Sequence, residues 1–574
     1  MPRTLFLLLL LLASLPALAT DLTVGYISRL PEIDYVWESS NPAVEGWPAA
    51  GSQVTWRANV RSWLDRPVEV EYVWRIDGIA VARGRAAIAP NATTAIDLPR
   101  TWSFTRSRIS IAIDTANEVA EQSETNNSLE VFSDALSVGF YVERSFYDHF
   151  RAHQAELGIG STSFENFAQR LIALFNDEAA LAVYPETPDG VLDRWRLQKI
   201  VVVPDGALPL TPPADSQVGQ EPNVESAQPN VADRSVDLQW GFPASKASAY
   251  GDFRTVALDN PFYIPAVILH ELGHARYLTD VYAFDVQHAP PGKVMEVPGV
   301  SKRAYIYLTP EQGLMNRNYS FIDRYSAIAL NRIAHHRAIA GNYNDPQNVG
   351  SFLNDLPLEN RLTIRDAAGN LMTDANVDIY QAAPFEADDW YAAHWDATPD
   401  VHLRTDANGQ VLVGRSPFGA TIVNYWRGSN VVAVVRVEKN GVVQFGYLES
   451  RLFNMASWRG ETAFADHELI VGRQRCGNSG PLLTSPAWDA TPAGPRVQLT
   501  WSPLPDATSY TIWTATPGLH PRRAGTTTST SITVPMAGRT YWWVEASFAN
   551  CPSQRSESSR LEVRAQPKTR AVRR

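Results

Sequence analysis

The amino-acid sequence predicts a multidomain protein in which one α+β domain is flanked by β-sandwich domains. The chain has 574 residues, which is too long for a single hydrophobic core. Apolar and polar residues alternate over residues 21–134 and again after residue 360, as they do in half-buried strands. Residues 164–184 instead have the apolar period of a helix, so helices and strands mix in the middle of the chain.

The N-terminus has the features of a secretory signal peptide. Residues 1–19 combine Arg3, an apolar run from Leu5 and the small-x-small triplet Ala17-Leu18-Ala19. The run is too short to span a bilayer comfortably, and we expect no membrane span elsewhere. A net charge of −11 argues against a nucleic-acid partner. These features predict a secreted protein, extracellular or periplasmic, with a bacterial-type export signal.

Residues 20–134 are expected to form an antiparallel β-sandwich. Apolar side chains alternate along residues 54–60, and Asp77-Gly78 is a hairpin signal. The stretch ISIAIDTANEVAEQSETNNSLEV resembles the last hairpin of CARDB adhesion-related domains, through Glu121, Glu124, Asn126 and Asn127. The resemblance implies an immunoglobulin-like module that binds or spaces and does not catalyse.

The α+β domain is expected over residues 135–350. LQKIVVV (197–203) and VDLQWGF (236–242) are predicted strands, and residues 320–338 have the pattern of a long helix. Between these strands and that helix lies AVILHELGHARYLTD, residues 266–280. This segment carries the residues that point to chemistry.

His270-Glu271-Leu272-Gly273-His274 is a candidate zinc motif. Histidines four apart share one helix face with β-carbons about 5–6 Å apart, so both imidazoles can reach one ion. Glu271 projects about 100° around the helix, beside the metal, where it can take a proton from water. Three polar residues on an ordinary helix are the alternative.

Zinc sites with catalytic function take three protein ligands, so a third ligand is needed. HELGHARYLTD resembles the metzincin pattern His-Glu-x-x-His-x-x-Gly-x-x-His/Asp, and snapalysin-like members have aspartate at the last position. The resemblance implies that Asp280 is the third ligand. It also implies a methionine turn at residues 313–316, in which Met315 would form a floor under the metal without binding it.

One position departs from the family pattern. Tyr277 stands where the family has the glycine that ends the helix. On an unbroken helix Asp280 would be rotated about 80° away from the His270 face, so ligation requires the helix to end near Tyr277. Asp285, His288 and Glu296 remain as alternative third ligands.

Two further β domains are expected. Residues 351–475 loosely resemble the prealbumin-like or carboxypeptidase-regulatory sandwich, through LTIRDAAGNLMTDANVDIY and LRTDANGQVLVG. Residues 476–566 resemble a fibronectin type III domain, through VQLTWSPLPDATSYTIW and TYWWVEASF, and residues 567–574 are a tail. Cys476 and Cys551, the only cysteines, are expected to form a disulfide outside the cell.

The resemblance implies a secreted zinc metalloendopeptidase with a metzincin-like α+β catalytic domain. Zn²⁺ would be its cofactor, a zinc-activated water the nucleophile, Glu271 the general base and a protein or peptide the substrate. The β-sandwich domains could bind an extracellular or cell-surface ligand. The alternative is a non-enzymatic secreted or surface adhesion protein, in which HELGH is a vestigial metal site.

Overall fold

The computed structural model describes residues 20–34, 46–148, 163–208, 233, 235–244, 263–288, 292–301, 306–316, 319–337, 353–384, 391–425, 428–472, 479–487, 490–492, 494–517, 519–549 and 551–563. The expected signal peptide (1–19) and tail (567–574) lie outside these residues. Cys476 also lies outside them, so its pairing with Cys551 stays a prediction. Among the described residues, no helix is both long and apolar enough to cross a membrane.

The N-terminal domain consists of two antiparallel sheets. One has the order β1-β2-β5 and the other β4-β3-β6-β7. Their bounds are β1 Leu22–Leu30, β2 Gln53–Ser62, β3 Val68–Ile76, β4 Ile79–Ile88, β5 Thr93–Thr101, β6 Arg108–Ile113 and β7 Ser128–Phe132, with the short helix η2 at Glu124–Asn126. The alternation along β2 buries Val54, Trp56, Ala58 and Val60, as expected, and Asp77-Gly78 joins β3 to β4 with positive φ angles of 49° and 80°.

The next region is built on a parallel sheet of order β10-β8-β9. β8 (Leu136–Glu143) is followed by α2 (Phe164–Leu181), β9 (Trp195–Val203) and β10 (Leu238–Phe242), so both predicted strands are present. α4 (Tyr263–His274), η5 (Val281–Phe284), β11 (Lys293–Met295) and α5 (Arg324–Arg332) follow. α5 is shorter than the helix expected over 320–338, because the Asp323 side chain caps its start and His335 adopts φ 67° beyond its end.

The region after residue 353 contains two main sheets. Their orders are β17-β12-β22 and β16-β13-β20-β21. The bounds are β12 Glu359–Arg365, β13 Asn376–Tyr380, β16 Val401–Arg404, β17 Gln410–Leu412, β20 Val432–Lys439, β21 Val442–Glu449 and β22 Phe464–Ile470, with α6 at Ser450–Trp458 and the small pair β18 Asn424–Tyr425 and β19 Gly428–Ser429. We call residues 353–472 the second β region.

The second β region is continuous with the α+β region. β15 (Ala393–Trp395) pairs in parallel with β11, and β14 (Ala383–Pro384) pairs with β15. One apolar core contains Trp63 of the N-terminal domain together with side chains from Leu136 to Val471. The expected boundary near residue 350 therefore does not separate two cores, and side chains from beyond it can reach the centre of the α+β region.

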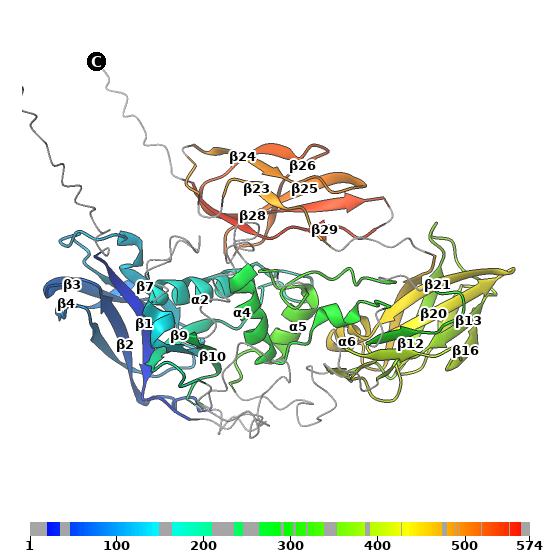
Figure 1. Cartoon of the computed structure of the whole chain (residues 1–574), viewed down its shortest axis with the longest axis horizontal. Coiled ribbons are helices and arrows are strands. Elements are labelled where there is room, and N and C mark those ends of the chain that lie inside the picture. The colour runs from blue at the N-terminus through cyan, green and yellow to red at the C-terminus, as the bar shows by residue number, and fades with distance from the viewer. Residues whose placement is uncertain are drawn as a thin grey trace, which may run out of the picture.

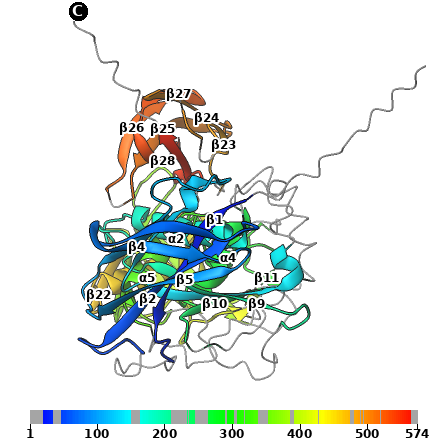
Figure 2. The ribbon, with the colours of Figure 1, turned by 90° about the vertical axis from the view of Figure 1, so that its left-hand side faces the viewer.

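The C-terminal domain is again a pair of antiparallel sheets. β23 (Leu483–Ser485), β24 (Arg496–Trp501) and β27 (Ser531–Pro535) form one sheet. The other contains β25 Ala507–Ala515, β26 Arg522–Thr527, β28 Gly538–Phe548, β29 Gln554–Arg555 and β30 Ser559–Val563. In Figure 1 this domain lies above the helices, between the N-terminal domain and the second β region. Figure 2 shows it projecting from the rest of the molecule.

The C-terminal domain packs against α2. Asp177 accepts a hydrogen bond from the Tyr541 hydroxyl and forms an ion pair with Arg539. Tyr541 and Trp543 also form an apolar cluster with Leu181 at the end of α2. Polar and apolar contacts together therefore fix this domain on the α+β region.

A second contact joins the C-terminal domain to residues 312–321. The backbone N–H of Ser320 donates to Glu557 at 2.9 Å, and its hydroxyl donates to the same carboxylate. Arg555 donates its backbone N–H to the Gln312 side chain at 2.9 Å, and its guanidinium lies 4.0 Å from the centre of the Phe321 ring. Both ends of the 312–321 segment are thus held from outside the α+β region.

The stability of the folded protein is expected to depend on pH, because this interface contains two acidic residues with raised pKa values. Burial raises the pKa of Glu178 to about 7, with Asp177 adding repulsion, and burial and Glu178 raise that of Glu557 to about 7. Because both folded-state pKa values exceed the ordinary value of 4.5, their contribution to stability is lost as pH rises from about 4.5 through 7. For Glu178, which is 1% exposed, we expect a loss of roughly 1–3 kcal/mol.

Glu178→Gln isolates this effect. The melting temperature of the full-length variant minus that of wild type is expected to be larger at pH 8 than at pH 5. At pH 8 Glu178 of the wild type ionises at a cost, whereas glutamine cannot ionise. Thermal unfolding followed by circular dichroism at both pH values measures it. If the melting temperatures of variant and wild type differ by the same amount at pH 5 and pH 8, the raised pKa of Glu178 is contradicted.

Candidate metal centre

The two histidines of the HELGH segment lie on α4 and face the interior. His270 is 3% exposed and His274 is 7% exposed. Their ring centroids lie 4.8 Å apart and the rings are nearly perpendicular, at 88°. The spacing of four residues therefore brings both imidazoles into one small volume, as the sequence predicts.

The chain leaves α4 through a tight turn at Tyr277. The Leu278 N–H donates to the Gly273 carbonyl at 3.1 Å, and the Tyr277 N–H donates to the His274 carbonyl at 2.8 Å. These two bonds, with φ of 60° at Tyr277, make up a Schellman motif, the common helix end with one left-handed residue. A tyrosine thus occupies the left-handed position at which glycine is usual.

This turn carries Asp280 back to the histidines. Asp280 Oδ1 lies 2.9 Å from His270 Nε2 and 3.4 Å from His274 Nε2. Among the described residues, these three form the one buried group whose potential ligand atoms all lie within 4.8 Å of one another. The structure therefore brings together the two histidines and the aspartate that the sequence analysis gives as expected metal ligands.

Backbone carbonyls determine which nitrogen of each imidazole is protonated. His270 Nδ1 lies 2.8 Å from the Leu314 carbonyl, and His274 Nδ1 lies 2.8 Å from the Leu278 carbonyl. A carbonyl only accepts, so each neutral ring has its proton on Nδ1 and a lone pair on Nε2. Both Nε2 atoms face Asp280 Oδ1, at 2.9 and 3.4 Å.

Two imidazole nitrogens and one carboxylate oxygen that converge in a buried site fit a bound cation. Burial acts to raise the pKa of Asp280, and positively charged, hydrogen-bonding imidazoles at His270 and His274 would hold it well below its usual range, so the carboxylate depends on a positive partner. A buried charge of this kind requires a compensating charge. Tetrahedral zinc with bonds of about 2.0–2.2 Å would separate its ligand atoms by about 3.3–3.6 Å, close to the distances measured to Oδ1.

Glu271 lies beside this group and not within it. Its Oε2 atom is buried and has no hydrogen-bond partner. Its charge is among those that raise the pKa of the Tyr282 hydroxyl, after burial and Asp280, and Tyr282 stacks on His270 with ring centroids 6.1 Å apart. An unpaired carboxylate at this place can accept a proton from a water molecule.

Residues 313–316 form a turn under the histidines. The Asn316 N–H donates to the Gly313 carbonyl at 3.0 Å, and Leu314 supplies the carbonyl that holds His270. Met315 is fully buried, and its carbonyl accepts the N–H of Val281, the residue after Asp280, at 2.8 Å. The turn therefore contacts both the first histidine and the segment that carries the aspartate.

Gly273 is required by the closeness of this turn. A β-carbon at Gly273 would lie 3.1 Å from Met315 Sδ and 3.2 Å from Leu278 Cδ1. Gly273→Ala is therefore expected to destabilise the protein by about 1–3 kcal/mol through overpacking. Urea unfolding measures the change. The penalty of Gly273→Ala should be smaller when it is measured in the Met315→Ala background, and an equal penalty in both backgrounds would contradict this contact.

The alternative third ligands lie elsewhere. Asp285 accepts the backbone N–H of Thr309 at 2.8 Å, and exposed Glu296 lies 3.2 Å from His394. His288 has a buried Nδ1 atom without a partner. Among the described residues, none of the three joins the group formed by His270 and His274.

Two residues of the second β region reach the centre and were not expected from the sequence. The Tyr391 hydroxyl bonds to Asp280 Oδ2. Asn424 donates to the Thr279 hydroxyl at 2.6 Å and to the Asp280 carbonyl at 3.2 Å. More than 100 residues separate these partners, and no motif or spacing in the sequence links them.

A second acidic group lies in the N-terminal domain. Ligand atoms of Asp114, Glu121 and Glu124 fall within 4.8 Å of one another. Asp114 already accepts two backbone N–H groups, at 2.9 and 3.0 Å, and Glu121 accepts that of Leu22 at 2.6 Å. These bonds fasten the loop before β7 and explain the group as structural.

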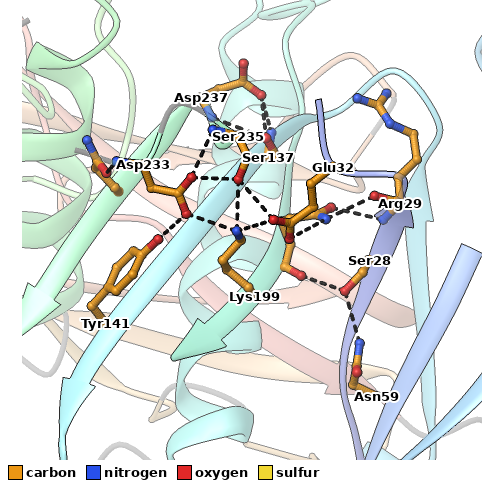
Figure 3. Close-up of polar contacts among 12 residues, drawn as sticks. Ser28, Arg29, Glu32, Asn59, Ser137, Tyr141, Lys199, Asp233, Ser235 and Asp237 are labelled. Atoms are coloured by element: carbon orange, nitrogen blue, oxygen red, sulfur yellow. Dashed lines mark hydrogen bonds and ion pairs between the residues drawn. The ribbon is translucent and has the colours of Figure 1, made fainter. Parts of the chain in front are cut away.

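Figure 3 shows a polar cluster where the N-terminal domain meets the parallel sheet. Lys199 Nζ lies 2.6 Å from Glu32, 2.9 Å from Asp233 and 2.9 Å from Ser235 Oγ. The two carboxylates raise the pKa of Lys199, although burial alone would lower it. Because Lys199 stays protonated, it cannot activate Ser235 as a nucleophile. The cluster joins two domains and is not a second active site.

Comparison with known proteins gives short alignments. No protein-family model matches the chain, and no curated protein matches it. Similar solved structures include a CARDB domain from Pyrococcus furiosus in complex with di-metal ions, at 17% identity over 20% of this chain and 91% of that one, with a TM-score of 0.15. A putative cell surface protein domain from Methanosarcina acetivorans is 19% identical over 20% of this chain and 90% of that one, also at 0.15.

A fibronectin type III-like protein from Clostridium thermocellum is 23% identical over 16% of this chain and 99% of that one, with a TM-score of 0.13. The first and the last of these three structures are of the two module types that the terminal regions resemble in sequence.

Proposed function

We propose that this chain is a secreted zinc-dependent metalloendopeptidase. His270, His274 and Asp280 would hold the zinc ion, and Glu271 would act as the general base. The observation that carries the proposal is the convergence of two imidazole Nε2 atoms and one carboxylate oxygen in a buried site, with Nε2–Oδ1 distances of 2.9 and 3.4 Å. Two histidines and one carboxylate are a ligand set of catalytic zinc sites.

Zinc would supply a Lewis acid that polarises a substrate carbonyl and lowers the pKa of water. Glu271 would take the proton from the attacking water and deliver it to the leaving amine. The Leu314 and Leu278 carbonyls would keep each imidazole in the tautomer that has its proton on Nδ1, which leaves Nε2 to bind the metal. The resemblance of HELGHARYLTD to metzincins supports a peptide bond as the substrate class, and residues 1–19 support export.

Metal content and chelator-sensitive cleavage test this function. The full-length protein is expected to contain close to one zinc per chain and to cleave casein. It should lose this activity to 1,10-phenanthroline and regain it with added zinc. A folded protein that binds no zinc would favour the alternative, a non-enzymatic surface protein with a vestigial site.

A further inference from the structure

Asp280 is held in place by the second β region. Tyr391 is 4% exposed and has φ of 53°, a conformation that tyrosine rarely adopts. Two residues later begins β15, whose parallel pairing with β11 anchors this part of the chain to the α+β region. The backbone of Tyr391 is thus fixed where its side chain reaches Asp280.

The hydroxyl of Tyr391 and the histidines contact different oxygens of the carboxylate. Tyr391 bonds to Oδ2, whereas His270 and His274 face Oδ1. The Tyr391 ring is edge-on to Tyr282, with centroids 5.6 Å apart, and Tyr282 stacks on His270. The tyrosine pair therefore fixes the carboxylate and one imidazole relative to each other.

The backbone of Asp280 is held from the same region. Asn424 donates to its carbonyl at 3.2 Å, and Ser429 Oγ donates to Asn424 Oδ1 at 3.0 Å. Asn424 is 2% exposed and Ser429 is 3% exposed. Both the side chain and the main chain of Asp280 are therefore positioned by buried residues from beyond residue 390.

From these contacts we infer that Tyr391 is a positioning residue that restricts Asp280 to metal binding through Oδ1, so that the second β region sets the metal affinity of the centre. A carboxylate without this bond has more rotational freedom to lose on binding, which weakens the site, and it can turn to offer both oxygens to one ion. Partners of metal ligands commonly contribute 10–100-fold to affinity. The inference rests on the proposed function, because it assumes that zinc binds at this centre.

Tyr391→Phe tests the inference in the full-length protein. Zinc affinity, measured by competition with a chromophoric chelator, is expected to fall about 10–100-fold. In the cobalt-substituted protein, the visible absorption is expected to weaken as Asp280 offers its second oxygen and the coordination number rises. Tyr380→Phe, a buried tyrosine of β13 in the same region, is the matched control and should change neither property.

The possible outcomes distinguish this inference from the proposed function. Wild-type affinity and an unchanged cobalt spectrum in Tyr391→Phe would overturn the inference and leave the function standing. A wild-type protein that binds no zinc would overturn both. If Tyr391→Phe does not fold, Asn424→Ser supplies the test at the backbone of Asp280, where weaker zinc binding is expected and unchanged binding would overturn the inference.

Discussion

Glu271→Gln is expected to slow peptide hydrolysis about 10²- to 10⁴-fold, which is the usual contribution of a positioned general base. Glutamine keeps the size of the side chain but cannot accept a proton at neutral pH. Zinc content is expected to stay at the wild-type value, because Glu271 does not belong to the group of ligand atoms. Initial rates on a fluorogenic peptide and metal analysis of the same samples measure both.

Glu296→Gln is the matched control for this change. Glu296 is exposed and lies 3.2 Å from His394, outside the three-residue group. Its substitution should leave both the rate and the zinc content unchanged. Wild-type activity in Glu271→Gln would show that another group removes the proton and would exclude the proposed role of Glu271.

Asp280→Asn is expected to weaken zinc binding by more than about 100-fold. Loss of a residue that only hydrogen-bonds a metal ligand usually weakens binding about 10–100-fold. Zinc at 1,000 times its dissociation constant stabilises a folded protein by about 4 kcal/mol, so wild-type protein should melt several degrees higher with zinc. A site weakened 100-fold would keep only about 1.4 kcal/mol of this stabilisation, so the rise should be about a third of the wild-type value or less in the variant.

Asp285→Asn is a closely matched control. Asp280 and Asp285 are each 2% exposed, and asparagine at 285 keeps an oxygen for the Thr309 N–H. This variant should melt higher with zinc, as wild type does. If Asp285→Asn loses the zinc response and Asp280→Asn keeps it, the assignment of the third ligand is wrong.

The sequence predicts the part of this centre that depends on local spacing. Two histidines four apart on one helix share a face whatever the rest of the chain does, and His270 and His274 do so. The position of Asp280 depends on the end of α4. Sequence rules favour glycine at the left-handed position, so they give no reason to expect the turn that Tyr277 makes.

The remaining contacts depend on the packing of distant segments. Tyr391 and Asn424 lie beyond the expected boundary at residue 350, in a region whose patterning indicates only a β-sandwich. Their contact with Asp280 follows from the pairing of β11 with β15, two three-residue strands too short to be recognised from periodicity. The contact of Glu557 with Ser320 has no local signal either.

The most direct test of zinc binding by these three residues is an anomalous difference map, recorded at the zinc absorption edge, from crystals grown with zinc. We expect one peak within about 2.0–2.2 Å of His270 Nε2, His274 Nε2 and Asp280 Oδ1. A map without a peak between these atoms, or one whose peak excludes Asp280, would contradict this expectation.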